Sequence, residues 1–187
     1  MSQNQRDIVL CINKWAKPHF KHEFRDLLNI KFNVSQEPMG TVTEVLCAKE
    51  FIHETFGLHY GDDLTEINYE ALIRLHREKN ATMTIATTTQ FALAVGVINI
   101  NSQGKVLQLR EKPAFGKPTW IGIAVLEPRA LTYFKPGEDI ATHTIPKMLK
   151  AGEPVYAYKT ESPWFDVGNI DQWRRADKYY RGKSYGN

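Results

Sequence analysis

Short apolar runs alternate along the first half of the chain with segments whose apolar residues recur at helical spacing. Continuous or alternating apolar residues predict strands, and a spacing of three to four residues predicts helices. Strands are expected at residues 8–12, 30–34, 56–60 and 83–88, and helices after Pro18, from Gly40-Thr41 onward and at 68–79. The order β-α-β-α-β-α-β is typical of a mostly parallel sheet with helices on both faces.

The pattern changes from Val95 onward. Residues 95–100 and 106–110, joined by the turn Asn101-Ser102-Gln103-Gly104, predict a β-hairpin. Further strands are expected at 121–126 and 155–159, and further helices at 142–150 and 170–180. No repeat, low-complexity tract or linker interrupts these elements, so residues 1–187 are expected to form one α/β domain.

Composition narrows the class of protein. The chain has 187 residues, 42% of them hydrophobic, and a net charge of only +3, which gives no reason to expect nucleic acid or a membrane as partner. The amino terminus, MSQNQRD, has no apolar segment of the kind that directs secretion, so a cytoplasmic location is expected. Cys11 and Cys47 lie in apolar sequence without a C-x-x-C pair, which favours buried free thiols over zinc binding.

Two acidic residues follow predicted strands, where α/β sheets collect their ligands. Asp62 follows Gly61 in YGDD, and Asp166 stands in SPWFDVGN just before the last helix. Mg²⁺ takes one or two carboxylates together with water and phosphate oxygens, so this pair is a candidate Mg²⁺ site. The alternatives are an Asx-type turn at Asp62 and a turn residue near a helix cap at Asp166.

Two other segments carry groups suited to a phosphorylated ligand. At the exit of the hairpin, Glu111 could accept hydrogen bonds from sugar hydroxyls and Lys112 could neutralise a phosphate, with Pro113 expected to hold Lys112 extended. A solvated surface pair is the alternative there. Gly40 and Thr41 begin a helix, where backbone N–H groups favour an anionic or polar ligand, although simple capping by Thr41 accounts for them equally.

Together these motifs resemble a known family. QEPMGT at 36–41, YGDD at 60–63, the hairpin with EKP at 111–113, WIGIAVLEP at 120–128 and WFDVG at 164–168 occur in the order and spacing of the sugar-1-phosphate nucleotidyltransferases. This family includes mannose-1-phosphate guanylyltransferase and glucose-1-phosphate thymidylyltransferase. The resemblance implies a Rossmann-like three-layer α/β/α fold with a mixed, mostly parallel sheet. It also implies transfer of a nucleoside monophosphate from a nucleoside triphosphate to a sugar 1-phosphate.

The resemblance further implies roles for individual residues. Asp62 and Asp166 would hold Mg²⁺, and Lys112 would face the sugar phosphate. The sugar pocket would be lined by Glu111, Gly96 and Gly122, and the base would lie near Gly40 and Thr41. The base and sugar used are not specified by these motifs.

The sequence departs from the family pattern in two places. The family opens with a strand, a glycine-rich G-G-x-G-T-R-L loop and a helix, none of which is present here, so the domain is expected to be incomplete at its amino terminus. Trp120-Ile121-Gly122 also stands where Asn-Ala-Gly is frequent. Three hypotheses follow: an active enzyme, whose loop is supplied in trans by a homo-oligomer or partner subunit; a non-catalytic subunit of an intact paralogue; or a gene fragment.

Overall fold

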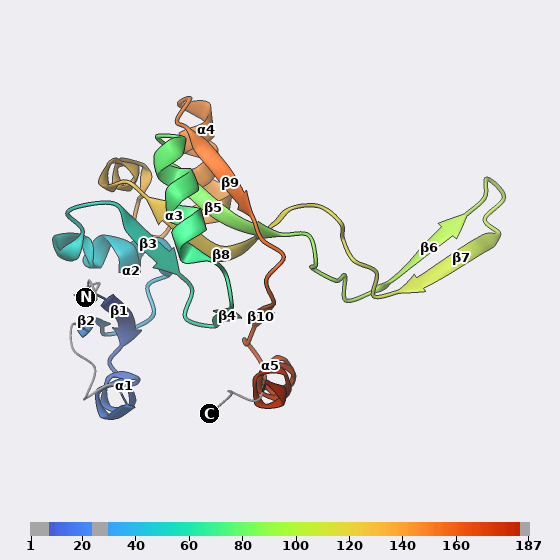
Figure 1. Ribbon diagram of the computed structural model, residues 1–187, viewed down its shortest axis with the longest axis horizontal. Coiled ribbons are helices and arrows are strands. Elements are labelled where there is room, and N and C mark those ends of the chain that lie inside the picture. Colours follow the sequence, from blue (N-terminus) through green and yellow to red (C-terminus); the bar gives the residue numbers. More distant parts are fainter. Residues whose placement is uncertain (1–7, 24–29, 184–187) are drawn as a thin grey trace. The chain divides into compact units, whose positions relative to one another are not determined.

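The computed structural model describes residues 8–23 and 30–183 (Figure 1). The chain divides into two compact units, Met1–Phe56 with Leu126–Val155 and Gly57–Val125 with Tyr156–Asn187. The single domain expected from the sequence stays a prediction.

The first unit is built on a two-stranded parallel sheet of β1 (Ile8–Asn13) and β2 (Ile30–Ser35), whose register pairs Ile8 with Ile30. Its helices are α1 (Lys17–Glu23), α2 (Thr41–Cys47), a 3-10 helix (Lys49–Phe51), a second 3-10 helix (Pro128–Tyr133), a π-helix (Ile140–Thr144) and α4 (Ile145–Lys150). Of the apolar residues expected in the first helix, Phe24, Leu27 and Leu28 lie outside the described residues.

The expectation of buried thiols is wrong. Ile8 is 50% exposed, and Cys11 and Cys47 are exposed free cysteines. The reason is that β1 pairs with β2 alone among the described strands, so its apolar side chains have few neighbours.

The second unit contains most of a four-stranded sheet of order β3-β8-β5-β9. The elements are β3 (Phe56–His59), β4 (Asp63–Thr65), α3 (Tyr69–Glu78), β5 (Met83–Thr88), β6 (Gly96–Ile100), β7 (Val106–Glu111), β8 (Thr119–Leu126), β9 (Val155–Lys159), β10 (Trp164–Asp166) and α5 (Ile170–Gly182). Both β4–β10 and β6–β7 are antiparallel pairs, so parallel and antiparallel pairing occur in one chain, as expected for a mixed α/β protein.

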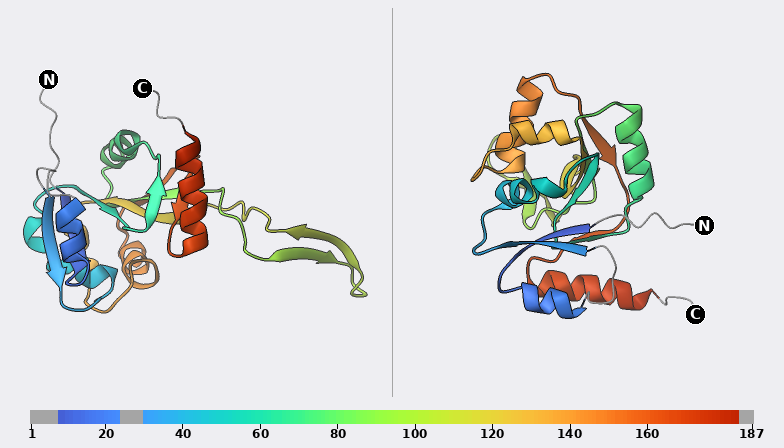
Figure 2. Two further views of the ribbon diagram at one scale, coloured as in Figure 1. Left: turned by 90° about the horizontal axis from the view of Figure 1, so that it is seen from below. Right: turned by 90° about the vertical axis from the view of Figure 1, so that its left-hand side faces the viewer.

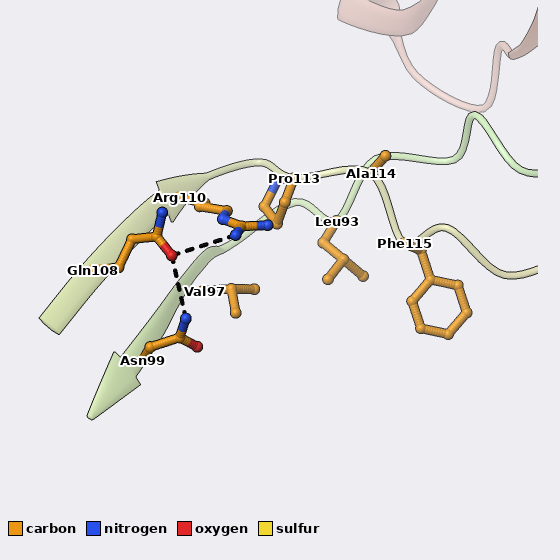
Figure 3. Close-up of a pocket in the computed structure, with 8 residues that line it drawn as sticks. All are labelled: Leu93, Val97, Asn99, Gln108, Arg110, Pro113, Ala114 and Phe115. Carbon is orange, nitrogen blue, oxygen red and sulfur yellow. Dashed lines mark hydrogen bonds between the residues drawn. The ribbon is translucent and has the colours of Figure 1, made fainter. Parts of the chain in front are cut away.

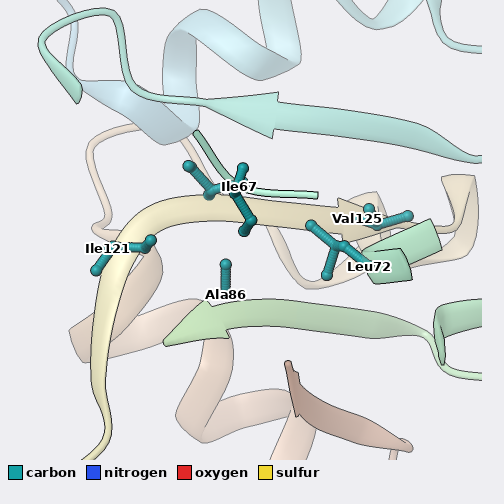
Figure 4. Packing of buried hydrophobic residues seen from close by; sticks show 6 residues of the cluster. Ile67, Leu72, Ala86, Ile121 and Val125 are labelled. Atoms are coloured by element: carbon teal, nitrogen blue, oxygen red, sulfur yellow. The ribbon is translucent and has the colours of Figure 1, made fainter. Parts of the chain in front are cut away.

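The core of the second unit lies where α3 packs on the sheet. Leu72 from α3 belongs to one buried cluster with Ile121 and Ile123 of β8 and Ala86 of β5, all at most 1% exposed. Figure 4 shows Leu72, Ala86 and Ile121 of this cluster. Asn68 precedes helix α3, and its Oδ1 accepts a 2.9 Å hydrogen bond from the Ala71 N–H and so caps the first turn. This packing stabilises the four-stranded sheet. The acidic loop before β4 follows β3, which is a strand of that sheet.

A single histidine lies in this core. His76 is 1% exposed, and its Nδ1 is 2.9 Å from the hydroxyl of Thr84. The hydrogen bond gives this buried imidazole a polar partner.

Candidate active site

The pairing of β4 with β10 brings the backbone segments of Asp62 and Asp166 side by side. Asp166 lies opposite Asp63 in the antiparallel register, and the Val167 N–H donates a 2.8 Å hydrogen bond to the carbonyl of Asp62. Although about a hundred residues separate them along the chain, the two candidate metal ligands therefore stand on neighbouring segments. The sequence predicted both residues but not the two three-residue strands that join them.

The two carboxylates differ in their surroundings. Asp62 is exposed and makes no side-chain hydrogen bond within the described part of the chain, whereas Asp166 is half-buried. Oδ1 of Asp166 accepts a 3.0 Å hydrogen bond from the Gly168 N–H, and a Cβ at Gly168 would lie 3.1 Å from that oxygen. Gly168 thus allows the backbone to approach and orient the Asp166 carboxylate.

Between them lies Asp63, a buried third carboxylate that is 6% exposed. Its Oδ1 accepts a 2.7 Å hydrogen bond from Nε1 of Trp164, the first residue of β10. Burial raises the pKa of Asp63 to about 6, the Trp164 hydrogen bond lowers it, and the negative charges of Asp62 and Asp166 raise it further. The sequence analysis assigned no role to Asp63. The Asp-Asp doublet was the available signal, but only the fold shows that its second member is the buried one.

Gly122 is the neighbour that makes room for Asp63. It has a φ of +70°, and a Cβ there would lie 2.1 Å from Asp63 Oδ2 and 2.8 Å from the Tyr60 ring. Its carbonyl accepts a 3.1 Å hydrogen bond from the Tyr60 N–H. The structure thus gives Gly122 a packing role, and its predicted contact with a sugar stays a prediction.

Glu111 and Lys112 lie at the base of the β6–β7 hairpin. Gly96 pairs with Glu111, and a Cβ at Gly96 would lie 3.1 Å from Glu111 Oε2, so these two predicted sugar contacts are adjacent. Within residues 8–23 and 30–183, no hydrogen bond or ion pair joins Glu111 or Lys112 to Asp62 or Asp166.

The expectation that Pro113 holds Lys112 extended is wrong. Lys112 has a φ of +45°, in the left-handed region that few non-glycine residues adopt. Its N–H still donates to the Val95 carbonyl at 3.2 Å, while the next bridge pairs Ala92 with Ala114. Between these two contacts, residues 92–95 take three steps against two for residues 112–114, so the pairing is irregular and the extra residue lies on the strand opposite Lys112.

Gly40 and Thr41 belong to the other unit. Gly40, with a φ of +81°, is the residue before the first turn of α2, and Thr41 is the first helical residue. The alternative interpretation, capping by the Thr41 side chain, is therefore wrong, since Gly40 occupies the cap position and provides no side chain.

Asp62 and Asp166 are a donor set that fits Mg²⁺. Both are hard oxygen ligands, and Mg²⁺ is commonly held by one or two carboxylates with water and phosphate oxygens. No group of three or more potential metal-ligating His, Cys, Asp or Glu side chains is found in the part of the chain that the structure describes. An ion at this site would thus take its remaining ligands from substrate and solvent.

A polar hollow adjoins the same strand. It measures about 230 Å³ and is bordered by Trp164, Phe165 and the guanidinium-bearing Arg175 of α5, together with Thr88, Gln90, Ser162 and Pro163. Arg175 was not predicted from the sequence, because helical spacing alone does not show that it lies beside β10.

Known proteins match this chain along most of its length. A family model described as nucleotidyl transferase matches residues 1–182. The chain belongs to the nucleotidyl transferase family. UTP–glucose-1-phosphate uridylyltransferase from Synechocystis is 34% identical over 134 residues, which are 66% of this chain and 34% of that protein. The chain spans about a third of the length of that nucleotidyl transferase.

Solved structures share the fold. HddC from Yersinia pseudotuberculosis, complexed with GMP-PN, superposes with a TM-score of 0.71 at 18% identity, covering 94% of this chain and 79% of HddC. A putative glucose-1-phosphate thymidylyltransferase from Bacillus anthracis, in complex with a sucrose, gives 0.67 at 16% identity, covering 93% and 74% of the two chains. These likenesses confirm the Rossmann-like nucleotidyl transferase fold that the sequence motifs indicated.

Within the described residues, no helix is both long and apolar enough to cross a membrane.

Proposed function

We propose that this chain carries the acidic site of a sugar-1-phosphate nucleotidyltransferase. In the proposed reaction, a phosphate oxygen of the sugar 1-phosphate attacks the α-phosphorus of a nucleoside triphosphate. The bond between the α-phosphorus and the oxygen bridging to the β-phosphate breaks, and pyrophosphate leaves with that electron pair. The products are a nucleotide sugar and pyrophosphate.

The observation that supports this proposal most is the pairing of β10 with β4. It sets Asp166 opposite Asp63 and beside Asp62, in a chain of the nucleotidyl transferase family. Because both substrates carry several negative charges, the reaction needs positioning and charge neutralisation more than it needs a covalent intermediate.

Asp62 and Asp166 would hold Mg²⁺. When bound there, the ion would neutralise charge on the phosphates of the two substrates. Asp63 and Trp164 would hold β4 and β10 together, so that the two ligands keep their spacing. Lys112 would neutralise the sugar phosphate, Glu111, Gly96 and Gly122 would line the sugar pocket, and Gly40 and Thr41 would contact the nucleotide base.

The test is pyrophosphate release from a panel of nucleoside triphosphates and sugar 1-phosphates with Mg²⁺. We expect turnover that Asp62→Asn and Asp166→Asn each reduce by about 10²-fold or more, as loss of one charged group that stabilises the transition state commonly does. Asp171→Asn is the matched control, because the Asp171 side chain is 84% exposed and, among the described residues, forms an ion pair with Arg174 alone.

The assay is run on the chain alone and again with a full-length paralogue that carries a glycine-rich loop. Turnover by the chain alone, or turnover above the paralogue's own that depends on Asp62, supports the proposal. Pyrophosphate release in neither mixture, from a chain that melts cooperatively, contradicts it.

A further inference from the structure

Two hollows of similar volume lie in the second unit, and an arginine borders each of them. The hollow on the β6–β7 hairpin measures about 220 Å³ and is bordered by Arg110, and the polar hollow beside β10 measures about 230 Å³ and is bordered by Arg175. Figure 1 and the left panel of Figure 2 show the hairpin extending away from α5, so the two hollows are separate. The surroundings of each arginine decide which hollow suits an anionic ligand.

The arginine of the hairpin hollow already has a partner. Nη2 of Arg110 donates a 3.3 Å hydrogen bond to Oε1 of Gln108, which also accepts a 3.2 Å hydrogen bond from Nδ2 of Asn99 (Figure 3). These side chains satisfy part of one another's hydrogen-bonding capacity. The Arg110 guanidinium is therefore held by the hairpin itself.

The arginine of the other hollow has no such partner. Arg175 is an exposed residue of α5, which packs on β10, and it makes no hydrogen bond or ion pair within the described parts of the chain. Its neighbour Arg174 pairs with Asp171 at 3.4 Å. None of the residues that border the hollow is acidic. The Arg175 guanidinium thus keeps its charge and its N–H donors for a ligand.

A buried hydroxyl borders the same hollow. Thr88, the last residue of β5, is 2% exposed, and its Oγ1 accepts a 3.1 Å hydrogen bond from the Gln90 N–H. That bond uses a lone pair of the oxygen, while the hydroxyl hydrogen has no acceptor among the residues that the structure describes. A buried donor without an acceptor is unfavourable, so an acceptor oxygen from a ligand would stabilise it.

The other polar groups at this hollow are already engaged. The hydroxyl of Ser162 donates to the Glu66 carbonyl at 3.2 Å, and the Ser162 N–H donates to Thr160 Oγ1 at 3.0 Å. Nε2 of Gln90 donates to the Glu161 carbonyl at 3.2 Å. These bonds form the wall of the hollow, and they leave the guanidinium and the Thr88 hydroxyl as its unsatisfied donors.

We infer that the hollow beside β10 binds a phosphate group through the Arg175 guanidinium and the Thr88 hydroxyl. A guanidinium binds carboxylates and phosphates by two parallel N–H···O bonds. This contact uses both oxygens of a carboxylate, whereas a phosphate keeps further oxygens for the hydroxyl donor. The hollow is large enough for several water molecules, so a group attached to the phosphate would fit against Trp164 and Phe165. The inference concerns this hollow alone and does not depend on the proposed reaction.

Titration of the full chain with inorganic phosphate, followed by the indole N–H resonance of Trp164, tests the inference. Trp164 borders the hollow, and comparison with Trp164→Phe identifies its resonance in a proton–nitrogen correlation spectrum. In metal-free buffer of constant ionic strength, phosphate should shift this resonance along a saturating curve, with a Kd on the order of 1–10 mM. Arg175→Met should weaken binding by about tenfold or more, because it removes the charge-assisted contact.

Arg174→Met is the matched control for that variant. It removes the same charge from the next position of α5, but Arg174 does not border the hollow, so phosphate should bind as it does to wild type. The inference is overturned if wild type shows no saturable shift, if Arg175→Met binds as wild type does, or if the two variants lose affinity equally.

The Thr88 hydroxyl is tested separately. Thr88→Val removes the donor at nearly constant volume and should weaken phosphate binding by about threefold or more, whereas Thr88→Ser keeps the hydroxyl and should retain it. Acetate should bind to wild type more weakly than phosphate at the same ionic strength. Unchanged affinity in Thr88→Val, or equal affinities for acetate and phosphate, contradicts the assignment of a phosphate group.

A hexose 1-phosphate distinguishes the two sources of such a group. Tighter binding than inorganic phosphate, lost in Arg175→Met, indicates a phosphate ester whose sugar contacts Trp164 and Phe165. Equal binding of the two ligands, again lost in Arg175→Met, indicates free phosphate, and either result supports the site. Binding of the hexose phosphate and of inorganic phosphate that Arg175→Met leaves unchanged overturns it.

Discussion

The indole N–H of Trp164 donates a 2.7 Å hydrogen bond to the buried carboxylate of Asp63. These residues are 101 positions apart, and each belongs to a strand of only three residues. The bond therefore joins two segments that have little backbone pairing of their own, and these segments carry Asp166 and follow Asp62.

Removing the donor should destabilise the chain. Trp164→Phe keeps an aromatic ring but leaves the Asp63 carboxylate without its hydrogen bond, so the free energy of unfolding should fall by about 1–3 kcal/mol at pH 7. Trp173→Phe is the control, since Trp173 is 49% exposed, and should change it by less than about 0.5 kcal/mol. Urea unfolding of the three proteins is the measurement, and equal stabilities would show that the bond contributes nothing.

Adding a methyl group at Gly122 should destabilise the folded chain far more than Trp164→Phe does. In Gly122→Ala the new Cβ would lie 2.1 Å from Asp63 Oδ2, at a φ of +70° that alanine adopts poorly. We expect a loss of about 3 kcal/mol or more, or failure to fold. Gly57→Ala, which meets nothing within 4 Å, should be nearly neutral. Part of the loss should return in Gly122→Ala with Asp63→Ala, and a thermal melt of these three variants and the wild type decides this.

Stability of the metal-free chain should depend on the titration of Asp63. Its pKa is about 6 when folded and 3.8 when free, so between these values the folded chain binds a proton that the unfolded chain does not. The free energy of unfolding should therefore decrease as pH rises from about 4 to 6, by up to ~1.4 kcal/mol per pH unit. Asp63→Asn should lack this component. If the difference in the free energy of unfolding between wild type and Asp63→Asn is independent of pH, folding does not raise the pKa of the Asp63 carboxylate.

Lys112 is held in a strained conformation at a position proposed to contact substrate. Replacement by glycine should relieve the backbone strain at a φ of +45° and raise the free energy of unfolding by about 0.5–1 kcal/mol. The same replacement should lower the affinity for the sugar phosphate. Asn80, with the same φ, serves as the comparison, and Asn80→Gly should have a smaller effect because asparagine tolerates this region. A destabilised Lys112→Gly would show that the lysine side chain is needed for folding rather than for binding.

Long periodic segments were predictable from the sequence. Residues 83–88 form the strand expected there, and α3 begins after Asn68 and covers residues 69–78 of the predicted 68–79. Such segments can be recognised in a sequence because apolar residues recur on one face over several helical turns or along a whole strand. Asp62 and Asp166 could be proposed from their motifs, although only the fold shows that they stand on neighbouring strands.

Features that depend on distant neighbours were not predictable. Strands β4 and β10 are too short to show a period, and they exist because Asp63, Trp164 and Asp166 meet across them. The left-handed Lys112 lies where the pairing with residues 92–95 becomes irregular, and local rules gave the wrong conformation. Cys11 was expected to be buried because its strand is apolar, but burial depends on which elements cover that strand.

The central claim is that Asp62 and Asp166 hold one divalent ion together. Titration of Mn²⁺ into the protein with a nucleoside triphosphate, followed by electron paramagnetic resonance, measures this without requiring turnover. The claim predicts one protein-bound ion per chain, lost in both Asp62→Asn and Asp166→Asn and retained in Asp171→Asn. Wild-type binding in either of the first two variants would contradict it.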